Sequence, residues 1–243
     1  MARTIKDPSA IFPEIIADYQ GACGDDLVSI ILYGSAAGKD YRPGKSDINF
    51  MVVLSEEGIE HLERAVPLVK KWRKKNVAVP LFLTEPYVKT SLDVFPIEYL
   101  TFQRGYRLVF GKDVLKDLAF DAEFIRLQCE REIKGKLLLL REAFLETSGK
   151  GRALKDVIRN SLPSMVAVFE ALLYLKGKDI PKEKRAIIRN TCEALEMDSR
   201  VFENLLDIKE GRSKPGEKET GALFKEYLTG MRRLAKQVDA LGG

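Results

Sequence analysis

The sequence predicts an α/β domain over residues 1–118 and an all-helical bundle over residues 119–243. In the first half, runs of β-branched residues alternate with helical patterns, which is typical of a sheet covered by helices. Beyond Asp121 such runs cease, and apolar residues recur at helical spacing. A chain of 243 residues is long enough for two modest domains of this kind.

The first half is expected to begin with a short helix and a buried strand at 28–33. A polar loop follows and leads into a second buried strand at 48–54. Ser55 is a favourable N-cap for the next helix, which is expected to run to residue 75 and to end in a basic cluster.

A third strand is expected at 77–83, where Pro80 indicates an edge position. Thr84 is then expected to cap a short helix. Alternating apolar residues predict a fourth strand at 95–102, and the run 106–110 either continues this strand or pairs with it.

The second half predicts helices at 121–147, 154–175, 181–195, 199–206 and 218–241. The second of these helices contains Pro163. Because proline lacks a backbone N–H and clashes with the preceding turn, it is expected to kink the helix or to split it in two.

Residues suited to binding phosphate and metal lie between the first two strands. Gly34 lets the backbone turn sharply and lets a ligand approach closely. The amides of this turn and the hydroxyl of Ser35 are suited to donate to phosphate oxygens. Asp47 and Asn49 are two residues apart, so on a strand they face the same side while Ile48 faces the core. The segment therefore predicts a phosphate-and-metal site.

Two other phosphate-binding motifs are absent from the sequence. A Walker loop requires a glycine five residues before the glycine of Gly44-Lys45-Ser46, and Lys39 stands there. The chain also contains no GxGxxG fingerprint.

The run Tyr33-Gly34-Ser35-Ala36, followed by Ser46-Asp47-Ile48-Asn49-Phe50, resembles the nucleotidyltransferase superfamily. Its members carry Gly-Ser, a loop, and then Asp-x-Asp or Asp-x-Glu. The resemblance implies a DNA polymerase beta-like α/β (α+β) fold with a mixed sheet, followed by a C-terminal helical domain as in kanamycin-type nucleotidyltransferases.

The same resemblance implies an activity and its partners. It implies transfer of a nucleoside monophosphate from an NTP to a hydroxyl of a small molecule, a protein or RNA. Acidic residues would hold Mg²⁺ or Mn²⁺ as the cofactor. The residues expected at the nucleotide are Gly34, Ser35, Lys45 and Ser46.

The metal ligands implied by the resemblance are Asp47, Asn49 and a third acid on a later strand. Glu98 is the first choice for the third acid and Asp93 the second, because Asp93 is expected to precede the strand. Asp47 and Glu98 would be the catalytic residues. Asn49 stands where the family carries a carboxylate, and its neutral amide adds no charge to the site. Two interpretations follow: an enzyme with a weakened second metal, or a catalytically silent protein that binds a nucleotide or a partner, like an antitoxin.

The composition and the termini limit other function classes. The net charge of +4 suits an anionic small molecule as well as RNA or DNA, but the basic residues look scattered, so nucleic-acid binding ranks last. Three distant cysteines and one histidine argue against a zinc site and against a disulfide framework. No signal peptide or apolar run long enough to cross a bilayer is seen, so a cytoplasmic protein without membrane association is expected. The sequence leaves a homodimer open.

Overall fold

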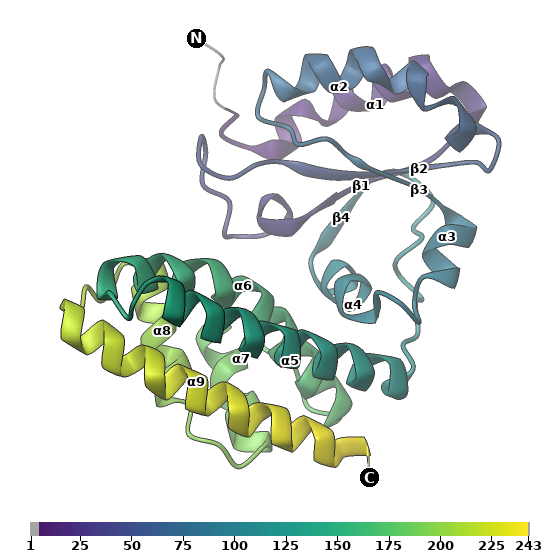
Figure 1. Cartoon of the computed structure of the whole chain (residues 1–243). Helices are drawn as coiled ribbons and strands as arrows, with labels where there is room; N and C mark the ends of the chain where they lie inside the picture. Colours follow the sequence, from purple (N-terminus) through teal and green to yellow (C-terminus); the bar gives the residue numbers. More distant parts are fainter. Residues whose placement is uncertain (1–4, 243) are drawn as a thin grey trace. The chain divides into compact units, whose positions relative to one another are not determined.

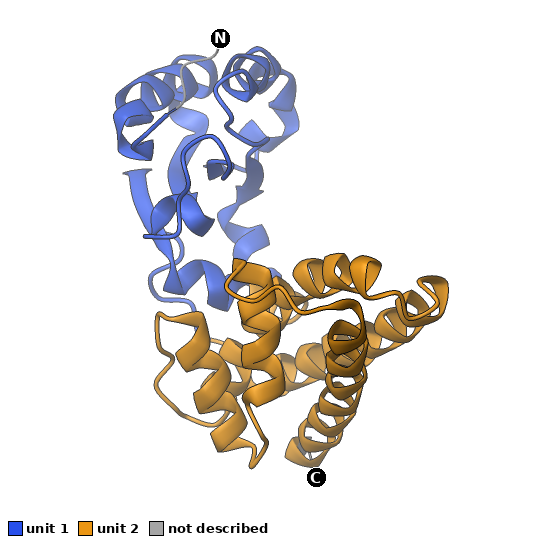
Figure 2. Ribbon diagram, turned by 90° about the vertical axis from the view of Figure 1, so that its left-hand side faces the viewer, with its two compact units in different colours: residues 1–92, 99–119 blue, residues 93–98, 120–243 orange. Residues whose placement is uncertain are grey.

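The computed structural model describes residues 5–242 and divides the chain into two compact units. The sheet unit comprises Met1–Leu92 and Tyr99–Ala119, and the helical unit comprises Asp93–Glu98 and Phe120–Gly243 (Figure 2). The predicted order of a sheet-containing half and a helical half is confirmed. The short segment Asp93–Glu98 packs with the helices, although it precedes the second half in the chain.

A mixed sheet with the strand order β3-β2-β1-β4 forms the centre of the sheet unit (Figure 1). Its strands are β1 (Leu27–Tyr33), β2 (Asn49–Leu54), β3 (Leu81–Thr84) and β4 (Tyr106–Gly111). β1 pairs antiparallel with both β2 and β4, whereas β2 pairs parallel with β3. Pro80 directly precedes β3, which is an edge strand as its sequence predicts.

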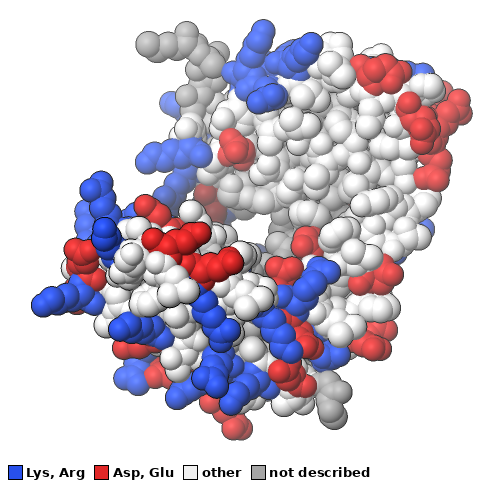
Figure 3. Space-filling view, viewed as in Figure 1, with Lys and Arg blue, Asp and Glu red and all other residues white. Residues whose placement is uncertain are grey.

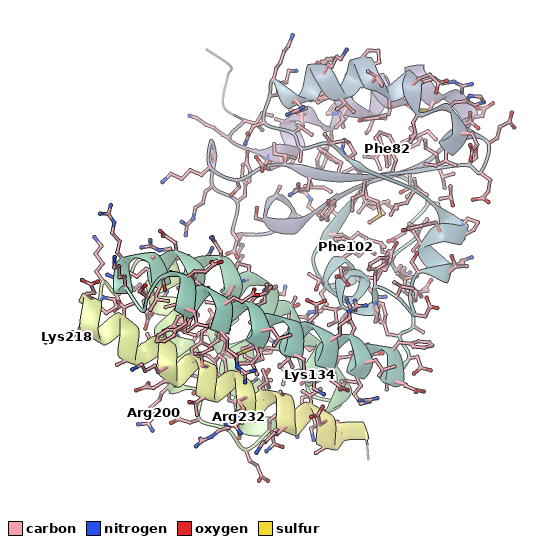
Figure 4. All side chains as sticks on the ribbon, in the orientation of Figure 1. Phe82, Phe102, Lys134, Arg200, Lys218 and Arg232 are labelled. Atoms are coloured by element: carbon pink, nitrogen blue, oxygen red, sulfur yellow. The ribbon has the colours of Figure 1, made fainter. Side chains whose placement is uncertain are left out.

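The two faces of the sheet are covered by different helices. Helices α1 (Phe12–Cys23) and α2 (Val66–Arg73) lie on one face, above a core that includes Ile30, Leu32, Phe50 and Val52 (Figure 1). On the other face, the ring of Tyr33 meets the ring of Phe102 at a centroid distance of 4.9 Å. Figure 4 shows Phe82 and Phe102 on opposite faces.

The strand predicted at 95–102 is wrong, because this segment forms the helix α4 (Pro96–Arg104). Pro96 occupies the first helical position, which suits a residue without a backbone N–H. Ile97 and Leu100 are both buried, and residues three apart lie on one side of a helix but on opposite sides of a strand. The chain then turns into β4, which pairs with β1.

The helix expected between Ser55 and residue 75 is interrupted. A 3-10 segment at Gly58–Ala65 precedes α2, and His61 departs from helical geometry with φ −118° and ψ 40°. The short helix α3 (Glu85–Thr90) begins as predicted, because the Thr84 hydroxyl accepts a hydrogen bond from the Tyr87 N–H at 3.2 Å. Further 3-10 segments are Pro8–Ile11, Gly24–Asp26 and Gly34–Ala37.

The helical unit is built from long helices around an aromatic core. They are α5 (Ala122–Glu146), α6 (Gly151–Leu175), α7 (Lys184–Ala194), α8 (Arg200–Glu210) and α9 (Glu217–Asp239), with a last 3-10 turn at Ala240–Gly242. Phe202 lies edge-to-face against Phe169 at 5.1 Å and against Tyr227 at 6.1 Å. These contacts join α6, α8 and α9 through buried rings.

Helix α6 continues through Pro163, so of the two expected outcomes, a kink or a split, the split is wrong. Pro163 cannot donate to the carbonyl of Arg159, four residues earlier. The Lys209 ammonium group donates to that carbonyl instead, at 2.6 Å. A side chain from α8 therefore supplies the hydrogen bond that the Arg159 carbonyl would otherwise receive from the backbone of the helix.

Charged groups also join α7 to α8. The Glu203 carboxylate accepts hydrogen bonds from Arg189, Arg185 and Ser199, at 2.7, 2.9 and 2.7 Å. The bond from Arg189 is the largest influence that lowers the pKa of Glu203, to about 2, although burial acts in the opposite direction. The carboxylate is thus held in its charged form at neutral pH.

All three cysteines are buried and free of disulfide bonds. Burial raises the pKa of the Cys129 and Cys192 thiols to about 12 and also raises that of Cys23. None of the described helices combines the length and the apolar character needed to cross a bilayer.

Candidate functional site

The two halves of the predicted motif meet where β1 ends and β2 begins. Tyr33 pairs with Asn49 across the antiparallel ladder, and Gly34 follows Tyr33 directly. Gly34 has a φ of +72°, in the left-handed region that favours glycine. A Cβ atom at Gly34 would lie 3.4 Å from Nδ2 of Asn49. The glycine turn and the Asn49 amide are therefore neighbours.

Asp47 lies at the surface just before β2, and its direction follows from the alternation along the strand. Ile48 is fully buried in the core beneath α1 and α2. Asn49 therefore projects to the opposite face, and the same alternation predicts this side for Asp47, which precedes the strand. Side chains directly opposite on paired strands share a face, so this is also the face where Tyr33 meets Phe102.

The loop between the two strands is closed by its own hydrogen bonds. The carbonyl of Arg42 accepts from the N–H groups of Lys45 and Ser46, at 3.0 and 2.9 Å. The Ser46 hydroxyl oxygen in turn accepts from the Arg42 N–H at 3.1 Å. Ser46 thus shapes the loop and keeps its own O–H as a donor. Lys45 is exposed beside it, and Ser35 is half-buried in the turn.

Glu98, expected on a strand, lies instead in the first turn of α4 and is exposed. Its carboxylate accepts a hydrogen bond from Nε2 of Gln128 at 2.6 Å. Oε1 of Gln128 accepts from the Ile97 N–H at 2.8 Å, so both ends of this buried amide are used. Glu98 belongs to the helical unit, whereas Asp47 belongs to the sheet unit. Asp93 is exposed in the turn before α4.

Sequence reasoning missed two residues beside the predicted acids. The first is Gln128, which the sequence could have indicated because it is a polar residue among the buried apolar residues of α5. Asn76 is the other, and its side-chain amide donates to the carbonyl of Ser46 at 3.0 Å. Its signal is an asparagine directly after a helix that ends in basic residues, which is a common place for the left-handed conformation.

The donors of the sheet unit are suited to a hard divalent cation. Over residues 5–242, no group of three or more His, Cys, Asp and Glu side chains is placed to hold a metal ion. The motif nevertheless offers the Asp47 carboxylate, the Asn49 amide oxygen and the Ser35 hydroxyl. Mg²⁺ prefers oxygen ligands and is commonly held by one or two carboxylates together with substrate phosphates. The residues therefore fit an ion that is shared with a bound triphosphate.

Helices α5 and α9 of the helical unit both carry several basic residues. Those of α5 are largely paired, since Arg126 and Lys134 both contact Glu130, at 2.9 and 2.6 Å. In Figure 3, Lys and Arg lie intermingled with Asp and Glu over the helical unit, and Figure 4 shows Lys218 and Arg232 on α9. Along α9, exposed cations recur at multiples of helical spacing, namely Lys218, Lys225, Arg232 and Lys236. Thr229 and Ala222 lie between them, so this stripe lacks an aromatic ring on which a base would stack.

The comparisons with known proteins identify the fold. No family model and no curated protein matches the sequence. Among solved structures, the chain is similar to a spectinomycin adenyltransferase from Enterococcus faecialis, whose structure contains ATP and spectinomycin. The TM-score is 0.51 at 13% identity, over 92% of this chain and 98% of that chain. The likeness covers both units and shows that this chain has the same fold as that adenyltransferase, a mixed sheet followed by helices, as predicted.

Proposed function

We propose that the protein transfers a nucleoside monophosphate from an NTP to a hydroxyl of a small-molecule acceptor. The meeting of the Gly34 turn with Asn49, with Asp47 on the same side of the strand, carries this proposal. The structural neighbour was solved with ATP and spectinomycin, so these are the nucleotide and the acceptor to test first. The buried cysteines of the present chain form no disulfide bond, which suits a reducing compartment, and we propose that the protein is cytoplasmic.

Each motif residue has a role in the proposed reaction. The Gly34-Ser35 turn holds the phosphates, and Lys45 offsets part of their charge. The Asp47 carboxylate and the Asn49 amide oxygen would hold Mg²⁺ or Mn²⁺. The bound ion would supply Lewis-acid stabilisation of charge on the phosphates. The acceptor oxygen attacks the α-phosphorus. The bond between the α-phosphorus and the oxygen that bridges it to the β-phosphorus breaks, and pyrophosphate leaves with that oxygen.

Glu98 is the residue that we propose to accept the proton of the acceptor hydroxyl. The family pattern calls for a third acid besides the motif residues, and Glu98 is the first choice that the sequence offers for it. The Gln128 amide holds one carboxylate oxygen of Glu98, and the other oxygen has no hydrogen bond to a described residue.

The neutral side chain at Asn49 favours a second candidate function. With one carboxylate fewer than the family pattern, the ion is held by less negative charge, and deprotonation of an acceptor is harder. A protein that binds the nucleotide without turning it over would show the same Gly34 turn and the same Asp47. The two functions differ only in whether pyrophosphate is released.

Thermal unfolding with each of the four common NTPs, with and without Mg²⁺, tests both candidate functions. We expect a higher melting temperature only when an NTP and the metal are both present, because ligand binding to the folded state stabilises it. Asp47→Asn should abolish this rise. Asp25→Asn is the matched control, since Asp25 is exposed beyond the opposite end of β1. If no NTP raises the melting temperature, both functions are refuted.

Pyrophosphate release then separates the two functions. Wild-type protein, ATP and Mg²⁺ are incubated with spectinomycin, and afterwards with other hydroxyl acceptors, including protein and RNA. Release that depends on the acceptor and is lost in Glu98→Gln establishes the transferase. Binding of ATP without release in the presence of any of these acceptors establishes the silent nucleotide-binding protein instead.

A further inference from the structure

Asn76 ends the turn that follows α2, and its backbone conformation is unusual. Its φ is +63°, and the described residues other than glycine with positive φ are Asn76, Ser148 and Glu196. The turn is tied to Trp72, whose carbonyl accepts from the N–H groups of Lys75 and Val77, at 2.8 and 3.2 Å. Trp72 is itself buried and donates to Asp18 at 2.9 Å. Asn76 therefore sits on a rigid support.

From this support, Asn76 contacts both peptide groups next to Asp47. Its side-chain Nδ2 donates to the carbonyl of Ser46 at 3.0 Å. Its own backbone carbonyl accepts from the N–H of Ile48 at 3.1 Å. The Ala78 N–H then donates to the carbonyl of Ile48 at 3.0 Å, which continues the parallel pairing of this segment. The chain is thus held on each side of Asp47, while the carboxylate stays exposed.

We propose that Asn76 is a positioning residue that fixes the backbone of Asp47 and so the direction in which its carboxylate meets the metal. This inference rests on the proposed function, in which Asp47 is a metal ligand. Ligands that are held by a second layer of hydrogen bonds bind metal more tightly, and loss of such a bond commonly lowers metal affinity by about 10–100-fold. Asn76 is exposed, so the lower end of that range applies.

A simpler role for Asn76 is also consistent with its conformation, because asparagine tolerates the left-handed region at the end of a helix. The two roles predict opposite results for glycine. Glycine adopts this conformation more easily than asparagine, so Asn76→Gly preserves the turn and removes only the bond to Ser46. Asn76→Ala removes the same bond and strains the turn as well.

The test is the affinity of Mn²⁺ for the full chain in the presence of α,β-methylene ATP, which cannot be cleaved at the reacting bond. Titration calorimetry measures the affinity, and thermal unfolding is measured in parallel. We expect Asn76→Gly and Asn76→Ala to weaken Mn²⁺ binding equally, by about tenfold. Asn76→Ala should lower the melting temperature more than Asn76→Gly, because only alanine also strains the turn. Glu196→Gly, which relieves the same backbone conformation in the helical unit, should leave Mn²⁺ binding unchanged.

The outcomes separate this inference from the function on which it rests. If Asn76→Gly binds Mn²⁺ like the wild type, or if Mn²⁺ affinity falls further in Asn76→Ala in step with its lower melting temperature, Asn76 is merely a helix-end residue and the inference is overturned. If the wild type does not bind Mn²⁺ with the nucleotide, or if Asp47→Asn binds it equally well, the proposed function fails, and the inference fails with it. Loss of binding in Asp47→Asn together with wild-type binding in Asn76→Gly overturns the inference alone.

Discussion

Replacing Gly34 with alanine tests whether the turn between β1 and the loop needs its left-handed conformation. An L-residue in this region is disfavoured by roughly 1–2 kcal/mol, and the φ of Gly34 is +72°. The added Cβ would meet Asn49 at 3.4 Å, an ordinary contact that adds little. For a chain of 243 residues, roughly 2–4 °C of melting temperature correspond to each kcal/mol, so Gly34→Ala should melt about 2–8 °C lower.

Two control variants separate strain from binding. Gly38→Ala adds the same methyl group in the same loop at a φ of −122°, with no atom within 4 Å, and should melt like the wild type. Gly177, in the helical unit, has a φ of +60°, and an added Cβ would meet no atom within 4 Å. Gly177→Ala should therefore be less stable than the wild type and still bind the nucleotide.

Denaturant unfolding with and without ATP and Mg²⁺ measures both effects. At a ligand concentration about 100 times Kd, the wild type should gain about 2.7 kcal/mol, and a variant that binds tenfold more weakly should gain only about 1.4 kcal/mol. We expect this smaller gain in Gly34→Ala alone. If Gly34→Ala is as stable as Gly38→Ala, the strain argument is refuted. If it gains as much from ATP as the wild type, the turn does not hold the phosphates.

Three further predictions concern charge and helix continuity. Asn49→Asp should tighten Mg²⁺ or Mn²⁺ binding in calorimetry, because it adds a carboxylate, and unchanged affinity would show that residue 49 does not face the metal. The pKa of Glu203 in the folded protein is about 2, below its ordinary 4.5, chiefly because Arg189 donates a hydrogen bond to the carboxylate. The charged carboxylate therefore stabilises the fold above pH 4.5, and this stabilisation is lost as the pH falls toward 2. The stability difference between wild type and Glu203→Gln, from urea unfolding, should therefore shrink by at most about 3 kcal/mol between pH 7 and pH 2, and a constant difference would contradict the low pKa. Lys209→Met should lower the free energy of unfolding by about 1 kcal/mol in the wild type. The loss should be smaller in a Pro163→Ala background, where the backbone N–H of residue 163 can donate to Arg159, and equal losses would show that the lysine does not replace that donor.

The strands of the motif were predictable because their signal is local. The β-branched runs that end at Tyr33 and begin beside Asn49 need no information from the rest of the chain. Once these strands pair antiparallel, the end of the first must lie beside the start of the second. The meeting of Gly34 with Asn49 follows from that pairing.

The segment around Glu98 was not predictable in the same way. Its aromatic and β-branched residues favour a strand locally, and packing of Ile97 and Leu100 into a core overrides that preference. The partner of Glu98 is Gln128, which is 30 residues away in the chain. Asn76 likewise acts on a carbonyl 30 residues earlier. Such contacts depend on the complete fold, and neither amide carries a motif.

The buried thiols allow the unfolding of each unit to be followed separately by chemical labelling. Alkylating reagents attack the thiolate, and burial with raised pKa values protects Cys23 in the sheet unit and Cys129 and Cys192 in the helical unit. A native molecule should therefore resist labelling, and each cysteine becomes reactive only when its surroundings open. Mass spectrometry of peptides labelled under mild denaturation would then report which unit unravels first, without any engineered probe.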